Sequence, residues 1–229
     1  MKISKKNTNQ GFTLVELLVV IAIIAALAGF ATPMVLKQMK KADMATATHN
    51  AKQLHLALFD FDQDYGFFPD QADSAQLGSG GASANAVLKQ LFINGSIESE
   101  ENFYAKTSFS KKPDGAVGTD PNYTNAIARG ELGFLYMDKQ STSKNPSRPL
   151  LAAPLRSSGG SPSSMLFDKD TYGGKMIVLR IDGSVKQFKI NKSSDIAEMV
   201  VNNQKVDIFS TQNKVWDSAT PTPLYPEAK

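Results

Sequence analysis

The 229-residue chain contains no cysteine and only two histidines. The lack of cysteine excludes a disulfide framework, a zinc–thiolate site, an iron–sulfur cluster and a cysteine nucleophile. His49 and His55 are six residues apart, so a helix would not place them on one face. We therefore expect partly exposed histidines and no metal site built on them. The sequence also has no Gly-x-Ser-x-Gly elbow, and we predict no catalytic residue and no enzymatic activity.

The excess of positive charge is small and comes from one end of the chain. The net charge is +3, and Lys2, Lys5 and Lys6 lie in the first eleven residues, which hold no acid. The rest of the chain has 22 basic and 22 acidic residues. A nucleic-acid-binding surface would need lysine and arginine clustered on the folded part, so no nucleic-acid partner is expected.

One long apolar run follows this basic tip. Residues 17–31 carry no polar side chain, and the segment from Phe12 to Ala31 would form about 30 Å of helix, the thickness of a bilayer core. A basic tip before an apolar run is typical of an export or membrane-insertion signal. The run fits a secretory signal peptide cleaved after Ala28, or an uncleaved single-span anchor. Neither interpretation gives a role to Glu16, whose carboxylate costs about 2.5–3.5 kcal/mol on insertion scales.

The residues around Glu16 favour a third interpretation. The stretch Gly11-Phe12-Thr13-Leu14-Val15-Glu16-Leu17-Leu18 resembles the processing site of the type IV pilin family, which includes pilus subunits and the pseudopilins of type II secretion. The resemblance implies that a membrane peptidase cuts between Gly11 and Phe12 and methylates the new amine of Phe12. It also implies that Glu16 pairs with the Phe12 ammonium of a neighbouring subunit, since each charge alone would be costly in an apolar bundle.

The same resemblance implies a function and a location. We expect a structural subunit of a type IV pilus or a type II secretion pseudopilus, anchored once in the inner membrane with its N-terminus cytoplasmic and its head periplasmic. The expected partners are further pilin-like subunits, the prepilin peptidase, a membrane platform and an ATPase, with no bound cofactor. Lys37, Lys40 and Lys41 balance the leader lysines across the span, so the positive-inside rule alone does not set this topology. The alternative is a membrane-anchored, surface-displayed binding module with a pilin-like fold, used for adhesion or for contact with a host or partner.

A helical stem is expected after the span. Pro33 would kink a continuous helix, or end it. Beyond it, one apolar face recurs at alternating spacings of three and four, while intervening polar residues indicate a solvated face. The apolar positions are Met44, Ala47, Ala51, Leu54, Leu58, Phe61 and Tyr65, and the polar ones include Asp43, Thr46, Thr48, Asn50, Lys52, Gln53, Asp60, Asp62 and Asp64.

The predicted class is α+β and pilin-like, with the long N-terminal helix packed on a small antiparallel β-sheet head that has long loops. Strands are expected at 148–155 and in a hairpin at 175–181 and 185–190, and residues 133–137 are expected to form a short strand or a buried segment. Short helices are expected at 84–92 and 194–202. One sheet face would pack on the stem and the other would be partly solvated. The expected segments are a leader (1–11), a transmembrane or filament-core helix (12–32), a stem (33–66), a head (67–217) and an extended tail (218–229).

Two further features of the head bear on its function. Asp168 and Asp170, which precede Gly173-Gly174, are weak candidates for calcium ligands, because two aspartates one residue apart are also common in turns. The pattern Gly173-Gly174 followed by Asp182-Gly183-Ser184-Val185 resembles the hairpin of large pseudopilin-like proteins. The missing cysteine pair departs from the many pilus subunits that close a C-terminal loop with a disulfide.

Overall fold

The computed structural model describes residues 12–74, 81–119, 121, 123–159, 165–201, 204–211 and 213–229. The leader and Gly11 therefore lie outside the described residues. The chain forms two units, the first ending at Met39 and the second running from Lys40 to Lys229.

The first unit consists of the beginning of helix α1 (Leu14–Tyr65). The helix continues through Pro33, so the alternative in which it ends there is wrong. Proline cannot donate a backbone hydrogen bond, and beside it the Thr32 hydroxyl donates to the Ala28 carbonyl at 2.7 Å. The side chains of residues 12–39 are all exposed.

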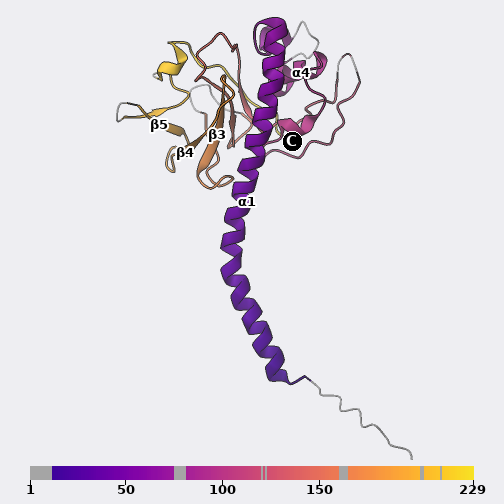
Figure 1. Cartoon of the computed structure of the whole chain (residues 1–229), viewed down its shortest axis with the longest axis vertical. Helices are drawn as coiled ribbons and strands as arrows, with labels where there is room; N and C mark the ends of the chain where they lie inside the picture. Colours follow the sequence, from indigo (N-terminus) through magenta and orange to yellow (C-terminus); the bar gives the residue numbers. More distant parts are fainter. Residues whose placement is uncertain are drawn as a thin grey trace, which may run out of the picture. The chain divides into compact units, whose positions relative to one another are not determined.

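In the second unit, the later part of α1 packs its apolar stripe into the head (Figure 1). Of the seven predicted stripe positions, Ala47, Ala51, Leu54, Leu58 and Phe61 are buried. Met44 packs against the same core, and the partly exposed Tyr65 stacks on Phe61 with ring centroids 4.4 Å apart. The periodicity of the sequence therefore identified the face that packs.

The predicted solvated face is wrong at two positions, Asn50 and Asp62, which are buried. Asn50 donates hydrogen bonds to the backbone carbonyls of Glu101 and Tyr104, at 3.0 and 2.8 Å. Asp62 accepts hydrogen bonds from Thr142. Both polar side chains are buried because they bind backbone groups of segments that are distant in the sequence.

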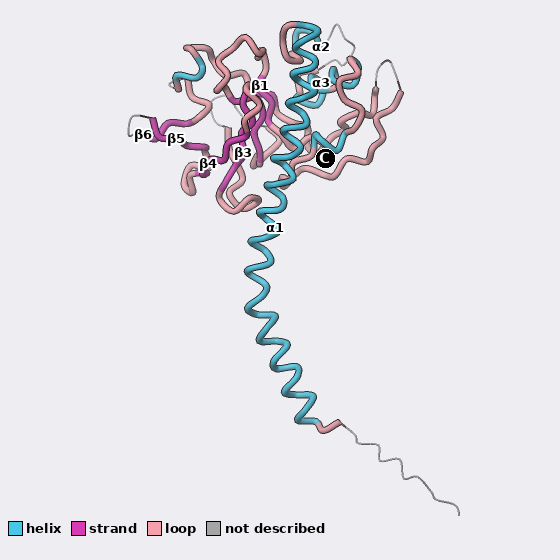
Figure 2. The backbone as a smooth tube through the Cα atoms, viewed as in Figure 1, coloured by secondary structure: helices cyan, strands magenta, loops and turns pink. Residues whose placement is uncertain are grey.

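The head holds a seven-stranded antiparallel sheet, which confirms the predicted α+β class (Figure 2). The three predicted strand regions are present, and the Asp182-Gly183 hairpin joins β3 to β4. The strands lie in the order β6-β5-β4-β3-β2-β1-β7. Their bounds are β1 (Leu135–Met137), β2 (Pro149–Ala153), β3 (Lys175–Arg180), β4 (Val185–Ile190), β5 (Ala197–Val201), β6 (Gln204–Asp207) and β7 (Pro223–Leu224).

The helix predicted at 194–202 is wrong, because residues 197–201 form strand β5. Ala197 pairs with Ile190 of β4, and the turn between them is closed by the bond from Asn191 N to the Ile196 carbonyl. Ala197 and Met199 both pack on one core. A separation of two residues is the spacing of a strand face, and this short apolar pattern fitted both periods.

Strands β1 and β2 and the middle of β3 are buried on both faces of the sheet, whereas β4 exposes Lys186, Gln187 and Lys189, so the expected solvated part is confined to the β4 side. Alternate residues of β3 divide between two cores: Ile177 and Leu179 pack on the side of α1, whereas Met176 and Val178 pack on the other side. That second core is closed by large side chains from segments outside the central strands, namely Phe167, Phe209 and Trp216. The indole N–H of Trp216 donates to the Ile208 carbonyl at 3.1 Å.

Short helices and the C-terminal segment complete the head. The helix predicted at 84–92 occurs as two pieces, α3 (Ala84–Leu88) and α4 (Gln90–Ile93), and the other short helices are α2 (Gln71–Ser74), η1 (Glu100–Phe103) and η2 (Lys214–Trp216). In the tail, β7 pairs with β1, with Leu224 opposite Tyr136. Gly130 N also donates to the Glu227 carbonyl at 2.8 Å, so the tail is bound to the sheet edge.

Candidate processing and assembly segment

The first turn of α1 is closed by a capping box. The Glu16 carboxylate accepts hydrogen bonds from the Thr13 backbone N–H at 2.9 Å and from the Thr13 hydroxyl at 2.7 Å. The Thr13 hydroxyl oxygen in turn accepts a bond from Glu16 N at 3.3 Å. A threonine followed three residues later by glutamate is the sequence signature of this motif. It fixes the helix start beside Phe12, whose side chain is 82% exposed.

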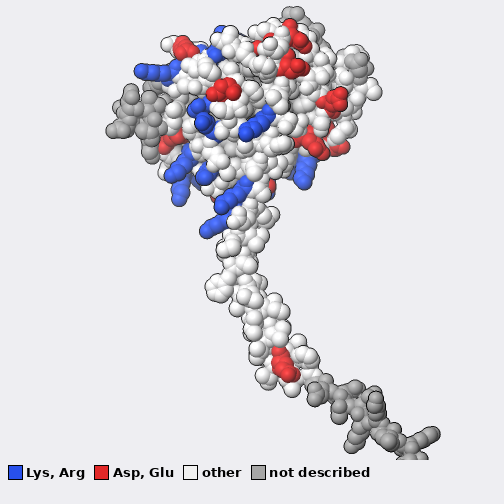
Figure 3. Space-filling model, viewed as in Figure 1, with Lys and Arg blue, Asp and Glu red and all other residues white. Residues whose placement is uncertain are grey.

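This intramolecular role of Glu16 was not predicted from the sequence. The signal was present as Thr13-Leu14-Val15-Glu16, but the carboxylate was considered only as a partner for a neighbouring subunit. Glu16 is the only acidic residue between Phe12 and Lys41. Figure 3 shows the lower part of the helix as a largely white surface, with acidic atoms near its beginning.

The surface around Glu16 is strongly apolar. Sixteen large hydrophobic side chains between Phe12 and Met39 are exposed, from Leu14 at 82% to Val19 at 47%. A continuous exposed apolar surface of this size indicates contact with a membrane or with other protein. By length and composition, α1 is the one helix of the described residues that could cross a membrane. Signal sequences have a similar length and apolar composition.

The two calcium candidates lie in a self-contained turn. One carboxylate oxygen of Asp168 accepts a bond from Asp170 N at 2.8 Å, and the other accepts the Thr171 hydroxyl at 2.6 Å. This is the ordinary use of an aspartate in a turn. The histidines are also apart: His49 is exposed, while Nε2 of the half-buried His55 lies 2.9 Å from the Ile181 carbonyl oxygen.

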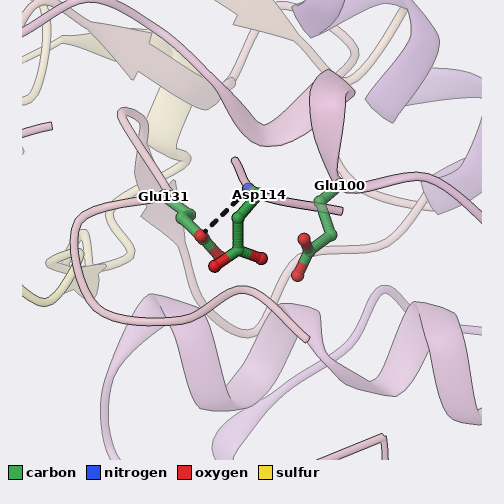
Figure 4. Close-up of side chains that lie close together, drawn as sticks. All are labelled: Glu100, Asp114 and Glu131. Carbon is green, nitrogen blue, oxygen red and sulfur yellow. Dashed lines mark hydrogen bonds between the residues drawn. The ribbon is translucent and has the colours of Figure 1, made fainter. Parts of the chain in front are cut away.

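A different acidic cluster exists in the head, at Glu100, Asp114 and Glu131 (Figure 4). Their carboxylate oxygens lie within 4.8 Å of one another, and Glu100 and Glu131 are buried. The cluster was not predicted from the sequence, because its three residues are separated by 14 and 17 positions in η1 and in two loop segments. No short spacing marks such a group in a sequence.

Backbone N–H groups already occupy most of these carboxylate oxygens. Glu100 accepts bonds from Ile127 N at 2.7 Å and Gly115 N at 3.1 Å. Glu131 accepts bonds from Ala128 N at 2.7 Å and Asp114 N at 3.3 Å, and it forms an ion pair with Lys111 at 3.0 Å. Burial and the neighbouring carboxylates of Glu131 and Asp114 raise the pKa of Glu100. The two buried glutamates thus tie down the backbone at Asp114, Gly115, Ile127 and Ala128.

Comparisons with known proteins agree with the N-terminal geometry. Residues 6–32 match the family described as the prokaryotic N-terminal methylation motif. This segment includes the expected cleavage point between Gly11 and Phe12, the capping box and most of the apolar helix. The expected resemblance to the type IV pilin family is confirmed over this segment.

The chain is also similar to a particular pilin, the type IV major pilin protein PilA of Myxococcus xanthus (strain DK1622). The two are 34% identical over 84 residues, which is 32% of this chain and 38% of the relative. The match therefore spans well under half of either protein. No solved structure matches the chain.

Proposed function

We propose that this chain is a structural subunit of a type IV pilus or a type II secretion pseudopilus, processed after Gly11 and assembled through α1. The proposal rests on the observation that the family match and two structural features fall on the same segment of the chain. The methylation-motif match at 6–32 covers a capped helix start and a helix whose apolar side chains are exposed. Filament assembly accounts for these features together.

Apolar burial supplies the driving force in this proposal. Burying one large apolar side chain fully is worth about 1.5–3 kcal/mol, and sixteen are exposed between Phe12 and Met39. Such a surface is favourable in a bilayer and equally favourable in a bundle of copies of the same helix. The helix can therefore pass from the bilayer into the helix bundle without being exposed to water.

Glu16 supplies the register. A charge left unpaired in an apolar bundle costs several kcal/mol. In the isolated chain the Glu16 carboxylate is satisfied by Thr13, at 2.7 and 2.9 Å. In the filament, the Phe12 ammonium of a neighbouring subunit would take one of these acceptor positions. A staggered neighbour pairs both charges, whereas a misplaced one leaves the ammonium alone.

The remaining parts of the proposal concern location and machinery. The apolar helix would anchor the subunit once in the inner membrane, with its N-terminus cytoplasmic and its head periplasmic. The prepilin peptidase would cut after Gly11 and methylate Phe12. A membrane platform and an ATPase would drive assembly with further pilin-like subunits, and the head needs neither catalysis nor a bound cofactor.

Substitution of Glu16 tests assembly. In cells, Glu16→Ala and Glu16→Gln should abolish filaments recovered by shearing while the processed subunit accumulates in the membrane. Glu98→Ala, which removes an exposed acid of the head, is the matched control and should assemble normally. Normal assembly of both Glu16 variants would contradict the proposal. It would favour instead a membrane-anchored, surface-displayed binding module.

A further inference from the structure

Lysines gather at the end of the head that begins with Lys40. A Cβ atom at Gly173, in the turn before β3, would lie 3.9 Å from Cδ of Lys40. Two residues further, Lys175 begins β3 and lies directly opposite Lys189 of β4. Lys175 is on the same face of β3 as Ile177 and Leu179, which pack in the core that includes α1. Lys40, Lys175 and Lys189, with the exposed Lys41, therefore share one region, which we name the basic rim.

The rim lysines have no acidic partner among the described residues. No carboxylate oxygen of the described part of the chain lies within 4.0 Å of their ammonium groups, and Lys175 donates only to the Gln187 side-chain oxygen at 3.4 Å. Like charges directly opposite on neighbouring strands, as at Lys175 and Lys189, are destabilising. Glu198 on β5 is the acid directly opposite Lys189, so the four lysines of the rim keep a net positive charge among the described residues.

Most nearby carboxylates are occupied by other groups. Asp43 pairs with Lys106 at 2.7 Å. Asp195 pairs with Arg156 at 2.6 Å and with Lys169 at 3.1 Å. Asp168 is bonded within its own turn, and Asp170 beside it is exposed. Glu198 lies opposite Lys189 on the neighbouring strand β5 and accepts a hydrogen bond from the Asn191 side chain. In Figure 3, lysine and arginine side chains line this edge of the head.

The position of Lys40 in the sequence indicates which anion the rim meets. Nine residues separate Lys40 from Ala31, the last residue of the apolar run, or about 14 Å of helix. The headgroup layer outside a ~30 Å hydrocarbon core is about 5–8 Å thick on each side. Lys40 and Lys41 would thus lie within about one Debye length, ~8 Å at physiological salt, of its outer boundary.

We propose that the basic rim docks the head on the phosphate groups of anionic lipids in the membrane that holds α1. The proposal rests on the proposed membrane insertion of α1. Each lysine near an anionic surface favours the bound state about fivefold, and the effect decays within a Debye length. Neutralising several rim lysines should therefore release the head while the helix stays inserted.

The absence of cysteine allows a site-specific test on the full chain. Ser193 is exposed beside Lys192, and a Ser193→Cys variant carries a fluorescent donor there. The chain is reconstituted in vesicles of phosphatidylcholine, with or without phosphatidylglycerol, that contain a headgroup-linked acceptor. Energy transfer should be higher with phosphatidylglycerol, and high salt should remove the difference.

Variants assign this effect to the rim. The triple variant Lys40→Gln, Lys175→Gln and Lys189→Gln should abolish the lipid-dependent gain, and the corresponding lysine-to-arginine triple should keep it. The matched control replaces three exposed lysines elsewhere in the second unit and keeps the gain. These control residues are Lys52, Lys112 and Lys144, each changed to glutamine.

The outcomes separate this inference from the proposed function. A labelled chain that floats with both vesicle types, but whose energy transfer ignores lipid charge, overturns the docking inference alone. If the rim triple and the control triple lose the lipid-dependent gain in energy transfer equally, the docking inference is also overturned, because the net charge of the head alone would then explain the gain. A chain that floats with neither vesicle overturns the membrane insertion of α1 as well.

Discussion

Of the three aspartates near the end of α1, Asp62 is the one whose removal should destabilise the head. Asp60, Asp62 and Asp64 occupy the last turns of α1, but only Asp62 is buried, at 5% exposure. Its carboxylate accepts bonds from the Thr142 backbone N–H at 3.1 Å and from the Thr142 hydroxyl at 2.5 Å. These two bonds tie the 138–147 segment to the helix end.

The expected cost follows from these two bonds. A hydrogen bond to a charged group contributes about 1.5–3 kcal/mol, but Thr142 is exposed and water recovers part of this value. Removing a negative charge from a helix C-terminus returns about 0.3–1 kcal/mol. The loss of the two hydrogen bonds is larger than the gain from removing the charge at the helix C-terminus. Asp62→Ala should therefore lower the free energy of unfolding by about 3 kcal/mol. Asp62→Asn keeps one acceptor and should cost about half as much.

Thermal unfolding of the full chain in detergent, followed by circular dichroism, measures this cost. For a unit of this size, ~3 kcal/mol corresponds to a decrease in melting temperature of roughly 6–12 °C. Asp60→Ala is the matched control, since it removes the same charge from the same helix end, and should shift the midpoint little or slightly upward. Equal midpoints for Asp62→Ala and Asp60→Ala would refute the argument from burial.

Three further predictions concern the core, the pH dependence and cation binding. Leu54→Ala, at a fully buried position, should cost about 3 kcal/mol of unfolding free energy, whereas Leu56→Ala, at 62% exposure, should cost less than about 0.5 kcal/mol in the same denaturation assay. Burial raises the pKa of Asp138 above its ordinary 3.8, so the folded state binds this proton more tightly than the unfolded state. As the pH rises from 3.8 through the raised pKa of the folded state, the wild type should therefore lose unfolding free energy relative to Asp138→Asn. A difference in unfolding free energy that does not change with pH would contradict this. Backbone N–H groups occupy the carboxylates of Glu100 and Glu131, so calcium should not bind there. Adding about 5 mM calcium, which exceeds the ~10⁻⁴–10⁻³ M dissociation constants of extracellular calcium modules, should leave the melting temperature unchanged. A clear increase in melting temperature would show that a cation displaces those hydrogen bonds.

The parts of the fold that follow from local periodicity were predictable. The α1 stripe from Met44 to Phe61 has helical spacing, and the β3–β4 hairpin has a turn dipeptide between two apolar segments. The second core was not predictable, because Phe209 and Trp216 reach it from irregular segments whose position depends on long-range packing. The helix predicted in place of β5 has a different cause, because that short apolar pattern fits both the helical and the strand period.

The candidate site shows the same division. The methylation motif at 6–32 and the unusual Glu16 could be recognised because the motif is local and the acid stands alone in an apolar run, whereas cleavage next to Phe12 stays a prediction. The capping box was equally local and was missed. The burial of Asp62 could not be inferred, since its partner Thr142 is 80 positions away. Spacing within α1 alone treats Asp62 as another exposed aspartate.

The central claim is that α1 is retained after cleavage at its capped start, and the mass of the mature chain tests it most directly. The intact mass and the N-terminal residue would be measured on the chain purified from its native membrane fraction. The account predicts a chain that begins at Phe12 and is heavier by one methyl group. A chain that begins near Gly29 would contradict it, because the apolar helix would then be a discarded signal peptide and Glu16 would have no role in assembly.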